Sequence, residues 1–177
     1  HEIDKGAIIG QIREKIAPED TVGTLYDRLM TIGSDLVLDS VNRIAEDNIS
    51  PIEQPQSDDN LRPAPKIFRD TCHINWLGCV DGIYNFVRGM SPYPAAWCEL
   101  VNANGDVVAL KVYAVSKEYA QHGKAAGAIV TDNKSYIKVA VEGGYVLLDE
   151  VQLAGKKRMP VADLLRGFSI DGLTLVL

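Results

Sequence analysis

A proline-rich stretch divides the sequence, and neither a helix nor a strand of ordinary length can cross it. Residues 48–66, NISPIEQPQSDDNLRPAPK, hold four prolines together with several Asp and Asn residues, and they show no sustained hydrophobic period. Proline lacks a backbone N–H and fixes its own φ, so closely spaced prolines favour extended backbone over regular structure. We therefore interpret residues 48–65 as a linker and expect separate folding units at residues 1–47 and 66–177.

Residues 1–47 combine one strand-like and two helix-like patterns. Residues 7–16, AIIGQIREKI, alternate apolar and polar side chains in their second half, which is typical of a half-buried strand. Apolar side chains recur at helical spacing over residues 22–30 and again over residues 34–45, and Gly33-Ser34 separates the two stretches. One strand and two helices carry more apolar surface than they can bury among themselves. We therefore expect this part to be the end of an α/β domain whose sheet is formed by other residues.

Residues 66–177 show the pattern of a small β-barrel. One helix is predicted around residues 80–88, and another begins at Pro160 and ends near Gly167. Between them lie short β-type stretches, separated by the turn signals NANGD and EGG, at residues 97–101, 107–115, 128–130, 137–141 and 145–153. The expected fold class of the chain is therefore α+β: the end of an α/β domain, a linker and a β-barrel.

The net charge of -6 is distributed unevenly along the chain. Residues 1–60 carry five Lys or Arg against thirteen Asp or Glu, whereas residues 61–177 carry thirteen against eleven. Such asymmetry indicates two functional parts, one of which meets an anionic partner. Lys156, Lys157 and Arg158 are adjacent, and three adjacent cations fit either a solvated turn or an anion-binding edge.

Composition excludes some classes of protein. No apolar stretch reaches the ~20 residues that a membrane-spanning helix needs. Cys72, Cys79 and Cys98 are odd in number and form no C-x-x-C pair, which favours a reduced, cytoplasmic protein over a disulfide framework. Cys72, His73 and Cys79 fit no standard zinc spacing, so no metal site is expected. The sequence begins at His1 within a turn-like stretch, and we expect it to be a fragment.

Four stretches, in the same order along the chain, resemble the methionyl-tRNA formyltransferase family: HEIDKGAIIGQIREKIAPEDTVGTLYDRLMTIG, RPAPKIFRDTCHINW, VRGMSPYPAAW and QLAGKKRMPVADLLRG. The resemblance implies the end of a formyl-transfer domain followed by a C-terminal barrel similar to the oligonucleotide-binding (OB) fold. It also implies transfer of a formyl group from 10-formyltetrahydrofolate to the amino group of methionine carried by initiator tRNA. The implied partner is initiator tRNA charged with methionine, and the chain alone is expected to be inactive because most of the catalytic domain is missing from it.

The resemblance places one catalytic residue, Asp4, in this chain. The family uses an Asn, a His and an Asp, and only the Asp of the EIDKG stretch matches; the Asn, the His and the folate-site loops correspond to residues before His1. A carboxylate beside an imidazole fixes its tautomer and stabilises its charged form, which is the role implied for Asp4. Lys5 stands where the family often has Thr. Without the resemblance, Asp4 fits a turn residue before Gly6 whose carboxylate accepts local backbone N–H groups.

The resemblance also implies that six cations bind tRNA: Lys156, Lys157, Arg158, Arg88, Lys111 and Lys66. Contacts from such side chains to phosphates give an affinity that falls as salt rises and carries little sequence information. The alternative for residues 156–158 is a solvated, charged loop.

Three aromatic residues are candidates for stacking on nucleotide bases. We expect Trp76 and Trp97 to fill the barrel core instead. Tyr93 lies between two prolines and is expected to be exposed, which makes it the better stacking candidate.

Two other functions stay open. Residues 66–177 would serve as a nucleic-acid-binding module if they hold nucleic acid without any catalysis. Folate-dependent sugar-nucleotide formyltransferases share the first and middle stretches, although the GKKRM stretch favours the tRNA enzyme.

Overall fold

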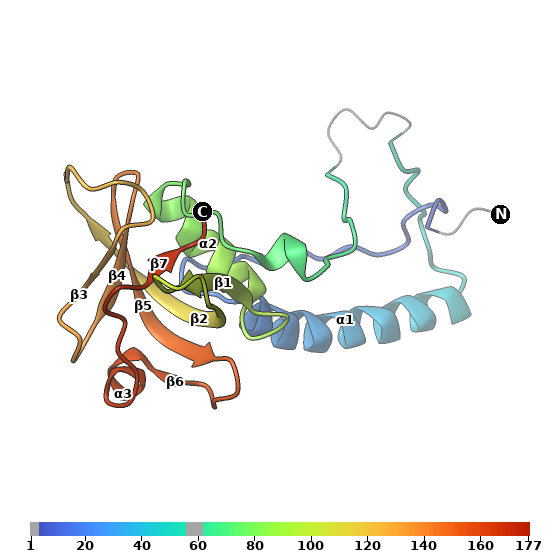
Figure 1. The fold of residues 1–177 in the computed structure, drawn as a ribbon. Helices are drawn as coiled ribbons and strands as arrows, with labels where there is room; N and C mark the ends of the chain where they lie inside the picture. The colour runs from blue at the N-terminus through green and yellow to red at the C-terminus, as the bar shows by residue number, and fades with distance from the viewer. Residues whose placement is uncertain (1–3, 56–61) are drawn as a thin grey trace. The chain divides into compact units, whose positions relative to one another are not determined.

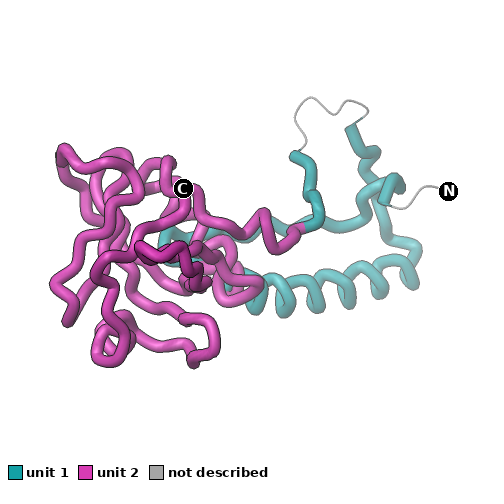
Figure 2. Tube along the Cα trace, in the orientation of Figure 1, with its two compact units in different colours: residues 1–20, 24–66 teal, residues 21–23, 67–177 magenta. Residues whose placement is uncertain are grey.

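The computed structural model describes residues 4–55 and 62–177 of the chain (Figure 1). The chain falls into two compact units, coloured separately in Figure 2: residues 1–20 with 24–66, and residues 21–23 with 67–177. Residues 56–61 of the predicted linker lie outside the described residues. The first unit contains most of one long helix, and the second contains the β-sheet.

A single helix, α1 (Val22–Ala45), replaces the two helices predicted from the sequence. The predicted break at Gly33-Ser34 is wrong, because the backbone continues through it in helical form. A glycine inside a helix costs only about 1 kcal/mol relative to alanine, and no proline or left-handed residue follows within α1 to end it there. The helix ends instead in a Schellman motif: Asp47 has φ 53°, and its N–H and the next one bond back to carbonyls of the last turn.

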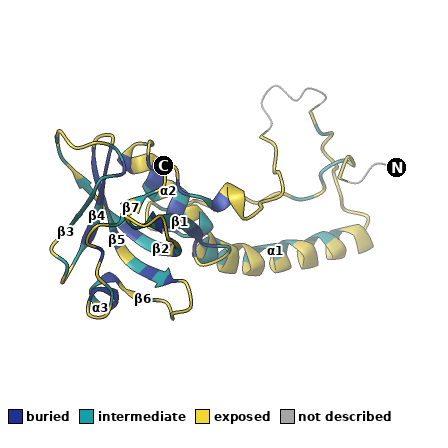
Figure 3. Cartoon of the chain, viewed as in Figure 1, coloured by how far each residue is buried: buried dark blue, intermediate teal, exposed yellow. Residues whose placement is uncertain are grey.

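The apolar side chains of α1 remain accessible to solvent. None of the residues of this helix is buried, as the yellow and teal ribbon in Figure 3 shows. The exposed set includes Tyr26, Leu29, Met30, Val37, Leu38, Val41 and Ile44. The prediction that this part of the chain carries more apolar surface than it can bury is therefore confirmed.

The predicted strand at residues 7–16 is not formed. Ile8 pairs through two hydrogen bonds with Ile52 (N···O 2.8 and 2.9 Å), and this is an isolated bridge. A strand needs a neighbour along its whole length to satisfy its backbone groups, and among the described residues this bridge is the only β-pairing that residues 7–16 make. The alternating pattern is present, but Ile12 and Ile16 are both more than half exposed.

Asp20 fixes the start of α1. Its carboxylate accepts hydrogen bonds from the Ala17 N–H (2.7 Å), the Thr24 hydroxyl (2.9 Å) and the Arg28 guanidinium (2.6 and 2.7 Å). Arg28 also donates to Glu14 (2.8 Å). The hydrogen bonds from Arg28, followed by the one from Ala17, hold the pKa of Asp20 well below its ordinary value. Asp20 is therefore a charged acceptor that ties the helix to the segment before it.

We expect Asp20→Asn to lower the thermal stability of the chain at neutral pH and to change it little in strong acid. The depressed pKa gives stability that is fully present above the unfolded value of about 3.9 and is lost as pH falls through the folded pKa. Thermal unfolding followed by far-ultraviolet circular dichroism over this pH range measures the effect. Asp27→Asn removes an exposed carboxylate from the same helix and is the matched control. Equal shifts for the two variants, or a shift that persists in acid, would contradict this account.

The second unit is an antiparallel sheet that curls into a near-closed barrel (Figure 1). Its strands are β1 (Ala96–Val101), β2 (Val107–Tyr119), β3 (Ile129–Thr131), β4 (Ile137–Val141), β5 (Gly144–Leu153), β6 (Met159–Pro160) and β7 (Thr174–Leu175). Neighbouring strands follow the order β3-β4-β5-β2-β1-β7, and β6 pairs with β5. The two open edges approach each other, because Asn133 after β3 hydrogen-bonds Asp171 before β7, and Leu177 packs against the backbone of Gly127. The predicted barrel is confirmed.

Side chains from the strands and from two helices, α2 (Val80–Met90) and α3 (Val161–Leu165), fill the barrel core. Trp76 is fully buried in this core, as predicted. The helices and strands predicted for this unit are all present, within a few residues of their expected ends. The 3₁₀ turn at Asp70–Cys72, β6 and β7 were not predicted, because two or three residues are too few to show a period.

Candidate nucleic-acid interface

A polar and aromatic surface covers the outside of β1, β2 and β5. Lys111 of β2 lies directly opposite Trp97 of β1 and Gln152 of β5 in the antiparallel register, and directly opposite residues project from the same face. Leu110 and Val112, on either side of Lys111, are fully buried, so Lys111 faces away from the core. We define the outer face as Trp97, Lys111, Tyr113, Gln152 and Arg158.

Arg158 joins the outer face through an aromatic ring and a carboxylate. Its guanidinium carbon lies 4.4 Å from the ring centroid of Tyr113, and its Nη2 lies 2.5 Å from Glu150 Oε2. The Tyr113 hydroxyl in turn donates to Gln152 Oε1 (2.7 Å). The hydrogen bond to Glu150 raises the pKa of Arg158 above its ordinary value. Arg158 is therefore charged, and Glu150 offsets part of its field.

Lys156 and Lys157 lie in the exposed turn between β5 and β6. This turn is held by two hydrogen bonds of 2.9 Å, from the Lys156 N–H to the Leu153 carbonyl and from Gln152 Nε2 to the Lys156 carbonyl. Because Gln152 belongs to the outer face, the turn adjoins that face. The structure thus brings four of the six predicted tRNA-binding cations into one region: Lys111, Lys156, Lys157 and Arg158.

The other two predicted cations belong neither to β2 or β5 nor to the turn that follows β5. Arg88 is in the last turn of α2, where its Nε donates to Asn85 Oδ1 (2.8 Å). Lys66 is exposed and is the last residue of the first unit. Similarity of sequence assigned all six to one role, whereas the fold groups only the four around β2, β5 and the turn that follows.

Trp97 is not a core residue, and the prediction that it fills the barrel is wrong. Its indole N–H donates to the Arg69 carbonyl (2.9 Å), its ring packs edge-on against His73 with centroids 4.7 Å apart, and the Arg69 guanidinium carbon lies 4.8 Å from its ring centroid. Ala96 and Cys98 on either side are fully buried, so Trp97 projects outward. The alternation within β1, AWCELV, is the sequence signal that indicates this orientation.

Asp4, the predicted catalytic residue, is exposed and belongs to the first unit. Its φ is 64°, a left-handed conformation in which Asp is enriched over most residues. Gln54 Nε2 donates to the carbonyls of Asp4 (2.8 Å) and Gly6 (2.7 Å), and the bridge between Ile8 and Ile52 continues this pairing. The backbone that carries Asp4 is therefore fixed by residues 52–54. Neither the Asn nor the His that the resemblance implies as its partners matches a residue of this chain.

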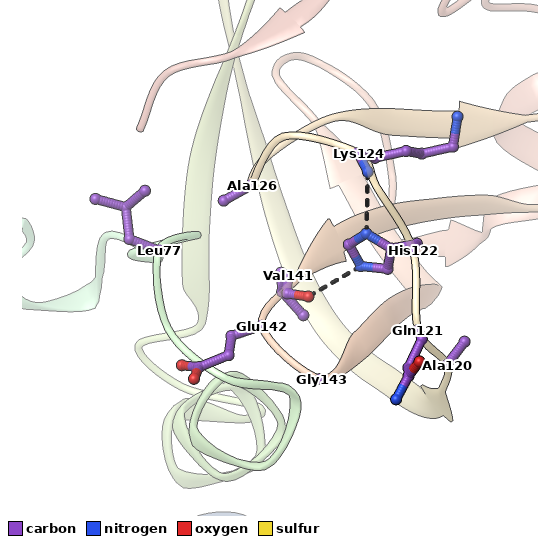
Figure 4. A pocket seen from close by; sticks show the side chains of 9 residues that line it. All are labelled: Leu77, Ala120, Gln121, His122, Lys124, Ala126, Val141, Glu142 and Gly143. Atoms are coloured by element: carbon purple, nitrogen blue, oxygen red, sulfur yellow. Dashed lines mark hydrogen bonds between the residues drawn. The ribbon is translucent and has the colours of Figure 1, made fainter.

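A second candidate site is a pocket of about 520 Å³ around His122, formed by the loop after β2 and the turn between β4 and β5 (Figure 4). His122 Nε2 lies 3.0 Å from the Val141 carbonyl and 2.8 Å from the Gly144 carbonyl, so this nitrogen carries the proton and donates. Nδ1 accepts from the Lys124 N–H (3.3 Å). Both ring nitrogens are engaged with the backbone, and His122 therefore holds the loop in place rather than transferring protons. Sequence reasoning did not single it out, since a lone histidine forms no pattern.

The cysteines form no disulfide with one another in the structure. Cys72 and Cys98 are buried, and burial raises the pKa of the Cys98 thiol to about 12. Cys79 is exposed, and its Sγ accepts from the Gly82 N–H (3.4 Å) at the start of α2. Within residues 4–55 and 62–177, no three His, Cys, Asp or Glu side chains gather as metal ligands. No helix in the same ranges is long and apolar enough to cross a membrane.

Residues 66–169, which include β1 to β6 and the outer face, match the family described as formyl transferase, C-terminal domain. The chain therefore belongs to the formyl transferase family.

Among the members of this family, methionyl-tRNA formyltransferases are similar to this chain in sequence. The sequence is 48% identical over 173 residues to that of Bacteroides thetaiotaomicron, covering 97% of this chain and 54% of the relative. It is 50% identical over 171 residues to that of Parabacteroides distasonis, covering 95% and 53%. The chain thus spans about half the length of the curated relatives it matches.

The fold comparison agrees at much lower sequence similarity. A crystal structure of a HypX variant from Aquifex aeolicus matches with a TM-score of 0.62 and 16% identity, over 94% of this chain and 29% of HypX. At that identity the likeness supports the fold alone.

Proposed function

We propose that this chain is the C-terminal part of a cytoplasmic enzyme of translation initiation, which transfers a formyl group from 10-formyltetrahydrofolate to the amino group of methionine on initiator tRNA. The observation that carries the proposal is the 48% and 50% identity, over nearly the whole chain, to proteins named methionyl-tRNA formyltransferase. Residues 1–47 then end the formyl-transfer domain, residues 48–65 form the linker, and residues 66–177 form the tRNA-binding domain.

Formyl transfer makes two demands on the protein. The amine nitrogen attacks the formyl carbon, so the amine must lose a proton, and the carbonyl oxygen gains negative charge that must be stabilised. The bond from the formyl carbon to the donor's nitrogen breaks, and the formyl group remains on methionine as an amide. Asp4 is proposed to orient an imidazole supplied by the half of the relatives that this chain does not cover. The donor site belongs to that same half in this proposal.

A chimera tests the proposed activity. We expect this chain alone to transfer no formyl group. Joining the uncovered half of the Bacteroides thetaiotaomicron relative ahead of residue 1 is expected to give a protein that formylates methionyl-tRNA. An amino-sugar nucleotide offered as a second acceptor distinguishes the tRNA enzyme from a sugar-nucleotide formyltransferase. Formylation of the sugar nucleotide alone, or activity of the chain by itself, would contradict the proposal.

The outer face and the turn beside it are proposed to hold tRNA phosphates. Lys111, Lys156, Lys157 and Arg158 carry positive charge in one region, and Arg88 and Lys66 are proposed as further contacts. Each phosphate that is neutralised releases counterions, so it adds about 0.7–0.9 to the slope of log affinity against log salt. If the chain binds tRNA while the chimera transfers no formyl group, the barrel is a binding module without catalysis.

Lys156→Ala combined with Lys157→Ala is expected to weaken tRNA binding by the chain and to lower the salt slope by about one for each contact that is lost. Filter binding over a salt series measures both quantities. Lys124→Ala combined with Lys134→Ala removes the same charge from exposed positions away from the turn and is the matched control. A tRNA signal that is absent or insensitive to salt, or an equal loss for the two double variants, counts against this surface.

A further inference from the structure

A groove next to the outer face combines exposed aromatic rings with cations. It has a volume of about 480 Å³, and its lining includes Phe68, Arg69, Tyr93, Trp97 and Lys111. These residues come from three stretches of the chain. Phe68 and Arg69 precede the 3₁₀ turn at Asp70–Cys72, Tyr93 lies in the turn after α2, and the other two lie on the paired strands β1 and β2. All of them belong to the second unit.

We propose that this groove binds an unpaired nucleotide of the RNA that lies on the outer face, with its base stacked against the exposed rings. The inference rests on the proposed function, which supplies the RNA, and adds a structural feature that the RNA must offer: at least one base whose face is free. Bases inside a duplex are stacked on both sides, so recognition by aromatic side chains selects loops, bulges and single-stranded ends.

Two aromatic side chains of the groove are largely exposed to solvent. Tyr93 is 83% exposed and Phe68 is 60% exposed. The turn that carries Tyr93 is fixed at its end by Ala95, which has φ 74° and donates its N–H to the Met90 carbonyl (2.9 Å). Tyr93 is thus presented on an ordered turn while its ring contributes little to the core. A ring held in this way is available for stacking on a flat ligand.

The charge of the groove favours a nucleotide over an uncharged flat ligand. Arg69 and Lys111, the charged residues among the described ones that line it, are both cations. Lys111 and Trp97 belong to the groove and also to the outer face. A chain of phosphates crossing the outer face can therefore continue past Lys111 and deliver a base to Tyr93 and Phe68. The volume is within the usual range of about 300–1,000 Å³ for small-molecule sites.

The experiment compares two RNAs that differ only in unpaired bases. One is a blunt duplex of about twelve base pairs, and the other is the same duplex with a few unpaired adenosines at one 3′ end. Fluorescence anisotropy measures the binding of each to the chain at fixed salt. Stacking of one base on an aromatic side chain raises affinity by roughly 5- to 150-fold, so the overhang should bind tighter by a factor in that range.

Variants then locate the stacked base. Tyr93→Ala should remove most of the gain from the overhang and leave binding of the blunt duplex unchanged, because the substitution removes no charge; the unchanged blunt-duplex affinity also shows that the variant is folded. Tyr93→Phe should keep the gain, and Phe68→Ala should reduce it. Tyr119→Ala, at a residue that is 63% exposed on the far end of β2, is the matched control and should have no effect.

Each result of this comparison supports or overturns the inference. Equal affinity for the two RNAs overturns it and leaves the proposed function standing, whereas failure to bind either RNA overturns both the inference and the proposed RNA-binding role of the outer face; formyl transfer is tested separately by the chimera. A gain from the overhang that survives Tyr93→Ala and Phe68→Ala also overturns it. Binding of an apolar peptide in the groove, without any gain from the overhang, would identify a protein ligand instead.

Discussion

Replacing Gly144 by alanine is expected to destabilise the barrel by about 4 kcal/mol and to lower its melting temperature by roughly 10–20 °C. A Cβ at this position would lie 2.0 Å from the Glu118 carbonyl oxygen and 2.9 Å from the Ala120 nitrogen. Both are backbone atoms at the end of β2, where Tyr119 pairs with Gly144, so neither can move without opening the ladder. The φ of 152° adds to the cost, because side chains other than hydrogen rarely tolerate it.

Gly143→Ala is the matched control for this prediction. Gly143 also has a positive φ, 85°, but nothing lies within 4 Å of a Cβ built there. The control therefore keeps the conformational cost, about 1–2 kcal/mol, and leaves out the collision. Thermal and urea unfolding followed by near-ultraviolet circular dichroism compare the two variants. If they lose the same stability, steric contact with β2 does not explain the need for glycine.

These two glycines also show how far sequence reasoning reaches in the barrel. The EGG signal predicts a turn with positive φ, and the structure confirms the turn. The close approach of β2 to Gly144 is a tertiary contact between residues far apart in the chain, and no local pattern encodes it. The same limit applies to the far end of β2, which was predicted to stop at Val115 and continues to Tyr119. There Lys117 pairs with Asp81 of α2 (2.8 Å) and Glu118 pairs with Lys138 of β4 (2.7 Å), so partners on other elements support a polar strand end.

The first unit shows the opposite error, in which a local pattern predicts more structure than forms. Residues 7–16 alternate as a strand should, but a strand exists only where a partner supplies hydrogen bonds. The Gly33-Ser34 pair looks like a helix boundary, yet the helix continues because ending it would need a turn that the sequence does not provide there. Both errors have the same cause. The residues allow a strand at 7–16 and a helix boundary at Gly33-Ser34, but they do not require either one.

The candidate site could be predicted only in part. The sequence shows which residues are charged, but it does not show which of them the fold brings together. Lys111 and residues 156–158 were identified as cations, and the pairing of β2 with β5 brings them together. Trp97 was assigned to the core because large aromatic residues are usually buried, whereas its neighbours in β1 are the residues that point inward. Phe68 and Arg69 carried no signal of their own. They become part of a groove only because the fold places them beside Tyr93 and Trp97.

In the chimera with a complete formyl-transfer domain, Asp4→Asn is expected to lower kcat by about 10²- to 10⁴-fold and to change KM for methionyl-tRNA little. An amide is nearly the same size as a carboxylate, but it cannot stabilise a charged imidazole and can hold the wrong tautomer. The Asp4 backbone is anchored through Gln54, so the substitution should leave the fold and tRNA binding intact.

Glu53→Gln removes another exposed carboxylate from the segment that pairs with residues 4–8, and it is the matched control for Asp4→Asn. It should leave both kcat and KM unchanged, because in our proposal only Asp4 reaches the reacting groups. Single-turnover formylation at saturating methionyl-tRNA measures the chemical step, and filter binding of tRNA to each variant measures the surface independently. If Asp4→Asn and Glu53→Gln have the same small effect on the chemical step, Asp4 is a turn residue whose carboxylate takes no part in catalysis. If Asp4→Asn instead weakens tRNA binding and leaves the chemical step unchanged, Asp4 acts structurally, by supporting the pairing of residues 4–8 with residues 52–54.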